Sequence, residues 1–144
     1  MEVKQIDAKD TIHLRHTVLR PNGKVEDCNF DNDNEDNTFH LGAYLNEQLV
    51  SCASFYLQNH PEIPNEYQYR LRGMATNEEH RGKGLSSELL RVAFPMIKRN
   101  HVNIIWCNAR SSAVGFYEKV GFKKIGSEFE VPEIGPHYLM IKHI

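Results

Sequence analysis

The chain has 144 residues, of which 40% are apolar and 25% charged, and its formal net charge is −2. This composition is ordinary for a globular protein, and the length suits a single domain over residues 1–144 that needs no disulfide or metal staples. The slightly acidic balance gives no reason to expect a nucleic-acid partner, and no apolar run approaches the roughly 20 residues of a membrane span. Because no apolar signal-peptide core follows Met1, we expect a cytoplasmic protein without a membrane partner.

Apolar periodicity and capping residues predict three helices. The first should begin after the N-cap candidate Asp7 and run over residues 8–20. In the second helix Pro95 should kink the last turns. The third is short, covers about residues 111–120 and stops at Gly121. One apolar face marks the second helix: Leu85, Leu89, Val92 and Met96.

Strand signals fill the rest of the chain. Combined with the helices they give the order β-α-β-β-β-α-β-α-β-β, which is typical of a mixed α/β fold. The expected strands cover residues 3–6, 38–45, 49–57, 67–76, 102–107, 122–131 and 137–144.

Two features that could bind a metal are interpreted as structural. Residues 31–37 are acidic and turn-rich, which is typical of a solvated loop. An EF-hand starting at Asp31 would need Gly and Glu where Asp36 and Gly42 stand. The three cysteines, Cys28, Cys52 and Cys107, form no Cys-x-x-Cys pair, so neither a disulfide nor a zinc site is expected. We expect Cys52 and Cys107 to be buried thiols and expect no metal.

The most informative segment is the glycine-rich turn over residues 81–84, Arg-Gly-Lys-Gly, between the strand at 67–76 and the second helix. Free N–H groups and the dipole at a helix start attract anions, and glycine lets the backbone approach a phosphate closely. A helix start with chance glycines is the structural alternative. The nucleotide P-loop pattern is absent, and the dinucleotide fingerprint fails because Ser87 occupies its third glycine position.

The pattern that fits this turn is [QR]-x-x-G-x-[GA]. Arg81 fills its first place and Gly84 its fourth, and Ser86 stands where glycine or alanine is usual. In this arrangement the amides from Gly82 to Ser87 are expected to hold a pyrophosphate.

A second motif lies downstream. The strand at 102–107 leads into Asn108, and a short helix carries Phe116-Tyr117 ahead of Gly121-Phe122. In this order and spacing the two motifs resemble those of the GNAT superfamily of N-acetyltransferases, and the resemblance covers most of the chain. It implies a single-domain fold with a mixed, mostly antiparallel sheet flanked by helices. It also implies direct transfer of an acetyl or other short acyl group from its CoA ester to a primary amine in a ternary complex.

The resemblance assigns roles to individual residues. In the family, the strand before the glycine turn separates from its neighbour and pairs with the pantetheine arm, a role that falls on residues 74–76. The Tyr117 hydroxyl would protonate the departing thiolate, whereas packing on Phe116 and Phe122 is the structural alternative. Asn108 either binds the pantetheine arm or caps its strand. The expected acyl-CoA contacts are Met74, Ala75, Thr76, Arg81, Gly82, Lys83, Gly84, Leu85, Ser86, Ser87, Asn108 and Phe116.

The sequence does not fix the general base. His137 is the leading candidate, because residues 132–136 form a restricted Pro-Gly-Pro turn before it and histidine titrates near neutral pH. The turn resembles a Gly-x-Pro-His-like turn in an uncharacterised bacterial branch of the family. A histidine that only caps a turn is the structural alternative. Other candidates are Glu78, Glu79, His80, His40, Glu128 and a water molecule.

Substrate contacts are expected from arginines. Arg15, His16 and Arg20 recur along the first helix, and Arg72 should share a strand face with Met74. Such a cluster could hold a carboxylate or phosphate, although a solvated helix face is the commoner meaning of scattered arginines. We expect Arg15 and Arg72 to contact a small-molecule or peptide amine. The amine and a homodimer stay open, as do two alternatives to an enzyme: a non-catalytic acyl-CoA-binding module and, less favoured, a nucleotide-binding protein.

Overall fold

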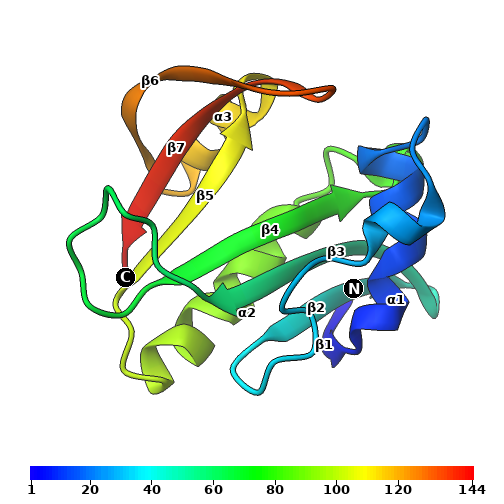
Figure 1. Cartoon of the computed structure of the whole chain (residues 1–144). Helices are drawn as coiled ribbons and strands as arrows, with labels where there is room; N and C mark the ends of the chain where they lie inside the picture. Colours follow the sequence, from blue (N-terminus) through cyan, green and yellow to red (C-terminus); the bar gives the residue numbers. More distant parts are fainter.

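The computed structural model describes all residues, Met1–Ile144, and its elements follow the predicted order (Figure 1). The strands are β1 (Glu2–Ile6), β2 (Phe39–Leu45), β3 (Gln48–Leu57), β4 (Tyr69–Thr76), β5 (Ile104–Arg110), β6 (Lys123–Val131) and β7 (Gly135–His143). The helices are α1 (Ala8–Leu14), α2 (Leu85–Arg99) and α3 (Val114–Lys119). Shorter helical turns are η1 (Arg15–Leu19), η2 (Val25–Cys28), η3 (Glu78–His80) and η4 (Ser111–Ala113).

All seven strands form one sheet in the order β1-β2-β3-β4-β5-β7-β6. Neighbouring strands are antiparallel except β4 and β5, which are parallel. The expectation of a mixed, mostly antiparallel sheet flanked by helices is therefore confirmed. The η3–α2 connection is the crossover that the parallel pair requires.

The helices pack on opposite faces of the sheet. Leu89 of α2 belongs to the main core cluster together with Leu41 of β2 and Phe55 of β3. Leu14 of α1 packs instead against Cys52 of β3 and Ala75 of β4. Side chains alternate between faces along a strand, so the central strands β3 and β4 supply apolar groups to both layers.

The helix boundaries differ from the predicted ones in detail. Asp7 caps α1 in a capping box, and its own N–H donates to the carboxylate of Asp10. The helix then widens into the π-helical turn η1, and Arg20 leaves the helical conformation as expected. Pro95 lies inside α2 without ending it, and the helix continues to Arg99.

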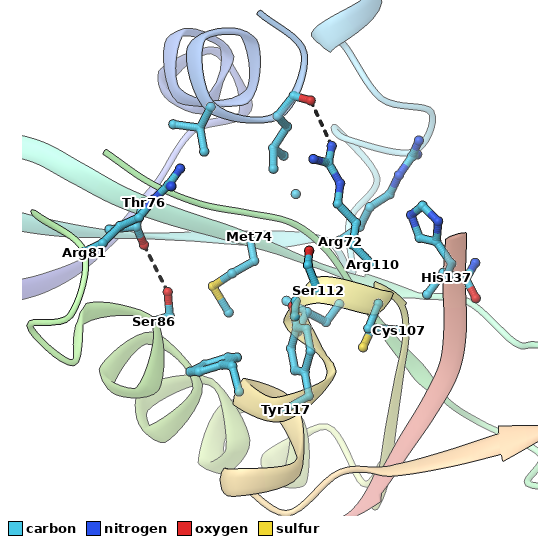
Figure 2. A pocket seen from close by; sticks show the side chains of 18 of the residues that line it. Arg72, Met74, Thr76, Arg81, Ser86, Cys107, Arg110, Ser112, Tyr117 and His137 are labelled. Carbon is cyan, nitrogen blue, oxygen red and sulfur yellow. Dashed lines mark hydrogen bonds between the residues drawn. The ribbon is translucent and has the colours of Figure 1, made fainter. Parts of the chain in front are cut away.

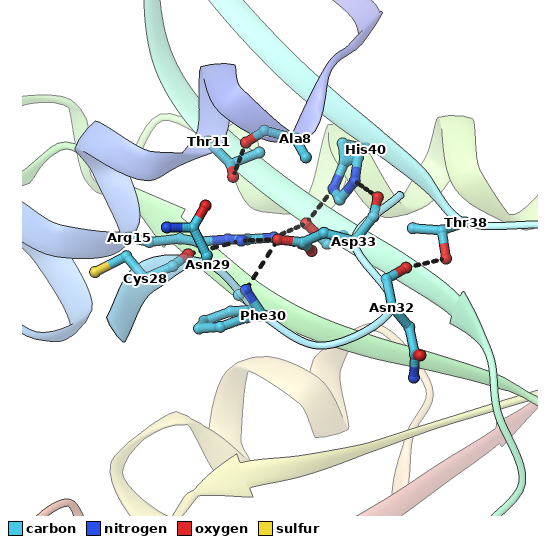
Figure 3. A network of polar contacts seen from close by, with 12 residues as sticks. Ala8, Thr11, Arg15, Cys28, Asn29, Phe30, Asn32, Asp33, Thr38 and His40 are labelled. Carbon is cyan, nitrogen blue, oxygen red and sulfur yellow. Dashed lines mark hydrogen bonds and ion pairs between the residues drawn. The ribbon is translucent and has the colours of Figure 1, made fainter. Parts of the chain in front are cut away.

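A buried ion pair organises the N-terminal half (Figure 3). Nη1 and Nη2 of Arg15 lie 2.7 and 3.0 Å from the two carboxylate oxygens of Asp33. Arg15 also donates to the Cys28 carbonyl and to the hydroxyls of Ser54 and Tyr56. The Tyr56 hydroxyl donates in turn to Asp33. The network therefore ties the acidic loop to η1 and to β3.

These contacts correct two expectations. The acidic loop is not solvated throughout, because Asp33 turns inward and is 8% exposed. Arg15 has no exposed surface, so its guanidinium cannot reach a substrate in this conformation. From the sequence we expected Arg15 to contact the substrate, with a solvated helix face as the alternative, because its buried partner in the loop could not be foreseen.

The three cysteines are free and buried, as expected for Cys52 and Cys107. Burial raises the pKa of the Cys52 thiol to about 12, although the positive charge of Arg15 opposes the shift. None of the helices is long and apolar enough to cross a membrane.

The charge state of Asp33 links the network to pH. Burial alone would raise the pKa of Asp33, but hydrogen bonds from Arg15, Tyr56 and the Phe30 N–H hold it below its ordinary value. A carboxylate whose pKa is lower in the folded state contributes stability above the unfolded pKa, about 3.9. That contribution is lost as the pH falls through the folded pKa.

The variant Asp33→Asn should therefore lower the free energy of unfolding at pH 7 by about 3–5 kcal/mol, because it leaves Arg15 as a buried charge without a counter-ion. Urea unfolding measures this loss, and the gap to the wild type should shrink below about pH 4. Asp31→Asn in the exposed part of the same loop is the matched control and should change little. Wild-type stability of Asp33→Asn at pH 7 would contradict the role of the ion pair.

Candidate functional site

A cavity of about 900 Å³ lies where β4 and β5 separate (Figure 2). The two strands pair only at Tyr69–Ile105 and Arg70–Trp106. Beyond these pairs the strands diverge, as Figure 1 shows. Residues of both strands line the cavity. The predicted divergence near Met74 and Asn108 is therefore confirmed, and both residues line the cavity.

A β-bulge shapes the cavity at the middle of β4. The β3–β4 register shifts so that Ala53 faces both Gly73 and Met74. Gly73 has φ +69°, and an added Cβ would lie 3.2 Å from the Phe30 ring and 3.3 Å from Nε of Arg15. Both the backbone conformation and the packing therefore require glycine here.

The bulge reverses the side-chain alternation that the sequence implied. Met74 packs against the core cluster that contains α2, whereas the guanidinium of Arg72 lies 3.9 Å from the centroid of the Phe30 ring. The expectation that Arg72 and Met74 share a strand face is thus wrong. Both side chains still border the cavity.

The glycine turn leaves its backbone donors unused. None of the N–H groups from Gly82 to Ser87 donates a hydrogen bond within the chain; the next donor along the chain is Glu88, to the Gly84 carbonyl. Gly82 and Gly84 have φ of +78° and +77°, and an added Cβ at either position meets no atom within 4 Å. The turn therefore presents free N–H groups to open space at the start of a helix, which is the arrangement that binds phosphates.

Ser86, which stands where glycine or alanine is usual, forms side-chain contacts that neither residue could form. Its hydroxyl oxygen lies 3.0 Å from Oγ1 of Thr76, and that Thr76 oxygen lies 2.7 Å from Oγ of Ser51. These contacts join the start of α2 to the ends of β4 and β3. They hold the free N–H groups of the turn beside the gap between the strands.

Most of the predicted acyl-CoA contacts line the cavity: Met74, Thr76, Arg81, Gly82, Gly84, Leu85, Ser86, Ser87, Asn108 and Phe116. Ala75 is buried beneath α1, and the exposed Lys83 ammonium lies 3.1 Å from Nδ1 of His80, so neither residue lines the cavity. Arg72 lines the cavity and Arg15 does not. The side-chain oxygen of Asn108 is buried without a hydrogen-bond partner.

Tyr117 of α3 lies where both a packing role and a role in the cavity are possible. Its ring is 7% exposed and packs edge-on against Phe116 and Phe122, with centroids 5.1 and 5.3 Å apart. It also borders the cavity beside Met74 (Figure 2). Burial raises the pKa of Tyr117 well above its ordinary value of 10.0, so the phenol stays protonated at neutral pH.

His137 faces the same cavity from β7, where it pairs with Arg110 of β5. Its Nδ1 lies 2.8 Å from the Gly135 carbonyl oxygen. A carbonyl can only accept, so Nδ1 carries the proton and Nε2 keeps a free lone pair in the neutral ring. The ring stacks on Phe129, with centroids 6.0 Å apart.

The other candidate bases lie elsewhere. Both ring nitrogens of His40 are engaged, with Ser54 and the Asp33 carbonyl, inside the buried network. Glu128 accepts a hydrogen bond from the Ser111 hydroxyl on the surface. His80 lines the cavity beside the glycine turn, and neither Glu78 nor Glu79 does.

Sequence reasoning missed two arginines, Arg70 and Arg110, and the aromatic Phe30, all of which line the cavity. Strand alternation was a signal for Arg70, because it lies two residues before Arg72. Phe30 had no such signal, since it lies in a loop between η2 and β2.

Comparison with known proteins places the chain in a family. The sequence matches the acetyltransferase (GNAT) domain over residues 21–141. It is 40% identical to the uncharacterized N-acetyltransferase YitI of Bacillus subtilis (strain 168) over 142 residues, which are 99% of this chain and 95% of that protein.

Solved structures share the fold. Escherichia coli ElaA superposes with a TM-score of 0.79 at 18% identity, covering 99% of this chain and 100% of that one. An aminoglycoside 6'-N-acetyltransferase complexed with coenzyme A gives 0.77 at 14% identity, covering 99% and 97%. At such low identities these structures show a shared fold only. The domain match, by contrast, spans most of the chain. The chain therefore belongs to the GNAT family of acetyltransferases, whose members transfer an acyl group from acyl-CoA to an amine.

Proposed function

We propose that the enzyme passes the acetyl group of acetyl-CoA directly to a primary amine while both substrates occupy the cavity between β4 and β5. The observation that carries this proposal is that one cavity joins the free N–H groups of residues 82–87 to Tyr117 and His137. Binding both reactants side by side replaces a bimolecular encounter with an oriented one.

The residues present fit an acyl-CoA. The free N–H groups of the turn, with Arg81 beside them, suit a pyrophosphate. The separated edges of β4 and β5 offer backbone partners to the amides of the pantetheine arm, and Asn108 offers a buried oxygen that has no partner of its own. Met74 lies at the bulge beside the gap, and its N–H is our candidate donor to the thioester oxygen.

The reaction replaces the carbon–sulfur bond of the thioester with a carbon–nitrogen bond and moves one proton from nitrogen to sulfur. The amine nitrogen attacks the thioester carbon, the carbon–sulfur bond breaks, the amine loses a proton and the sulfur gains one. Nε2 of His137 is the candidate acceptor of the amine proton, either directly or through a water molecule. The hydroxyl of Tyr117 is the candidate donor to the sulfur.

The raised pKa of Tyr117 refines its role. Thiols ionise at about pH 8.5, whereas the pKa of the Tyr117 phenol lies well above 10.0. Full proton transfer from this phenol to a thiolate is therefore uphill. We therefore propose that the hydroxyl stabilises the developing thiolate through a hydrogen bond before the proton moves. A donor already in place lowers the barrier without reorganisation.

A covalent acyl-cysteine is disfavoured. Cys107 lines the cavity, but burial raises the pKa of its thiol, so the reactive thiolate is scarce at neutral pH. This supports direct transfer in a ternary complex.

Gly84 tests the phosphate site. Gly84→Asp should abolish measurable CoA binding, because its carboxylate would project into the open space where we place the pyrophosphate. Gly84→Asn has the same shape without the charge and should weaken binding much less. Both residue types tolerate positive φ better than most, so both variants should fold. Calorimetry with CoA makes the comparison, and wild-type affinity of Gly84→Asp would rule out the site.

Tyr117→Phe should lower turnover by ~10²–10⁴-fold and leave acetyl-CoA affinity nearly unchanged, because the ring remains. Thiol release from acetyl-CoA with an accepted amine measures the rate. Because burial raises the pKa of Tyr117, its ionisation should not reduce the wild-type rate below about pH 10. Tyr138→Phe on β7 is the control. Should Tyr117→Phe keep wild-type turnover, Tyr117 has only a packing role.

His137→Ala should cut turnover and remove the loss of rate at acidic pH, because a protonated imidazole cannot accept the amine proton. A pH–rate profile of the wild type and the variant measures both effects, with the exposed His143→Ala on the same strand as control. A raised KM with the acid limb intact would mean that His137 binds substrate only. No change in either would place the base elsewhere.

A further inference from the structure

The wall of the cavity that lies away from the glycine turn is rich in arginine. Arg20, Arg70, Arg72 and Arg110 line the cavity, and no aspartate or glutamate does. In Figure 2, Arg72 and Arg110 lie together with His137, whereas Arg81 and Ser86 lie on the opposite side, with Met74 and Tyr117 between the two groups. The arginines are therefore separate from the proposed pyrophosphate site.

These arginines lack counter-ions. The salt bridges of the chain join other residues: Lys4–Glu2, Arg15–Asp33 and Arg91–Glu88. Nε of Arg70 is buried without any hydrogen-bond partner. Arg110 donates to a backbone carbonyl, that of Leu19, at 2.8 Å. All four arginines are half-buried. Charges that are partly removed from water are normally paired, so this cluster is incomplete without a ligand.

Aromatic rings hold two of the guanidinium groups in place. Arg72 lies over Phe30 at 3.9 Å from the ring centroid, and Arg70 lies over Trp106 at 4.9 Å. A guanidinium on a ring face keeps its N–H groups free at its edge, and that planar fork matches a carboxylate or a phosphate. Arg15 shows the contrast within the same chain, because its fork is filled by Asp33.

The positive charges of these arginines also repel one another. Burial and, to a smaller extent, the positive charge of Arg72 lower the pKa of Arg70 to about 10. Burial likewise lowers the pKa of Arg110, and the charge of Arg20 adds to the shift. A bound anion would relieve the repulsion and replace the lost hydration.

We propose that the acceptor amine carries an anionic group, a carboxylate or a phosphate, which Arg70, Arg72 and Arg110 hold on the side of the acetyl group away from the glycine turn. This inference rests on the proposed acetyl transfer. It disfavours polycationic acceptors such as polyamines and aminoglycosides, because like charges meet in a partly desolvated site.

The test compares primary amines of stepped chain length in matched sets: ω-amino carboxylates, the corresponding carboxamides, ω-aminoalkyl phosphates and α,ω-diamines. Within a set of equal length, kcat/KM for the carboxylate or the phosphate should exceed that for the carboxamide by about 10–100-fold, the value of a charge-assisted hydrogen bond. Whichever of the two anions wins identifies the group. Carboxamides or diamines that react as well as both anions would overturn the inference while leaving the acetyl transfer intact.

Variants connect the preference to the arginines. Arg72→Gln and Arg110→Gln should each raise KM for the anionic amine about tenfold or more and leave KM for the carboxamide nearly unchanged. Arg99→Gln, on the exposed end of α2, is the control. CoA affinity close to that of the wild type shows that each variant is folded. A preference for anions that survives both variants would overturn the assignment.

A binding measurement separates this inference from the proposed function. Alkyl carboxylates and alkyl phosphates, which have no amine, should raise the melting temperature of the CoA complex of the wild type, and Arg72→Gln should abolish that rise. The inference then stands on binding even if no amine is acetylated, in which case the proposed function is what fails. No stabilisation by either anion would overturn the inference.

Discussion

The separation of β4 from β5 is the constraint on which the site depends. β5 pairs with β7 along its whole length, from Ile104–His143 to Arg110–His137, but pairs with β4 at only two positions. The edge of β5 that faces β4 is therefore free. Because a parallel pair needs a crossover, the chain returns through α2, and the start of that helix lies at the carboxyl end of β4. One topological choice thus places a gap between strands, unpaired backbone edges and a phosphate-binding helix start together, where ligands bind in many α/β proteins.

Arg15 and Arg72 lie on the same ring, that of Phe30, but only Arg15 has a counter-ion. Arg15 is neutralised by Asp33, and this ion pair is built into the fold. Arg72 is half-buried and forms no ion pair with a carboxylate. Phe30 connects the two: its N–H donates to Asp33 at 3.0 Å, and its ring lies 4.0 Å from the guanidinium of Arg15 and 3.9 Å from that of Arg72. The ion pair that stabilises the N-terminal half therefore also fixes the ring on which Arg72 lies, so stability and acceptor recognition share one structural unit.

Local patterns predicted the order of the elements, the glycine turn and the Phe-Tyr helix, because caps, periodicity and positive-φ glycines are short-range properties. The divergence of the strands followed from the family resemblance and not from the residues alone. Local patterns could not predict tertiary pairing. Asp33 was expected in a solvated loop and Arg15 at the substrate, but the two residues pair with each other in the interior. The bulge at Gly73 was missed for a similar reason, since one extra residue reverses every later side chain of β4 and becomes visible only against the register of β3.

A crystal structure of the enzyme with bound CoA tests the central claim most directly. The account predicts a pyrophosphate against the N–H groups of residues 82–87 and a pantetheine arm between β4 and β5. The thiol should lie near Tyr117, and the arginine-lined side of the cavity should stay open for the acceptor. A CoA that binds outside the gap, or strands that close along their full length when CoA binds, would contradict it.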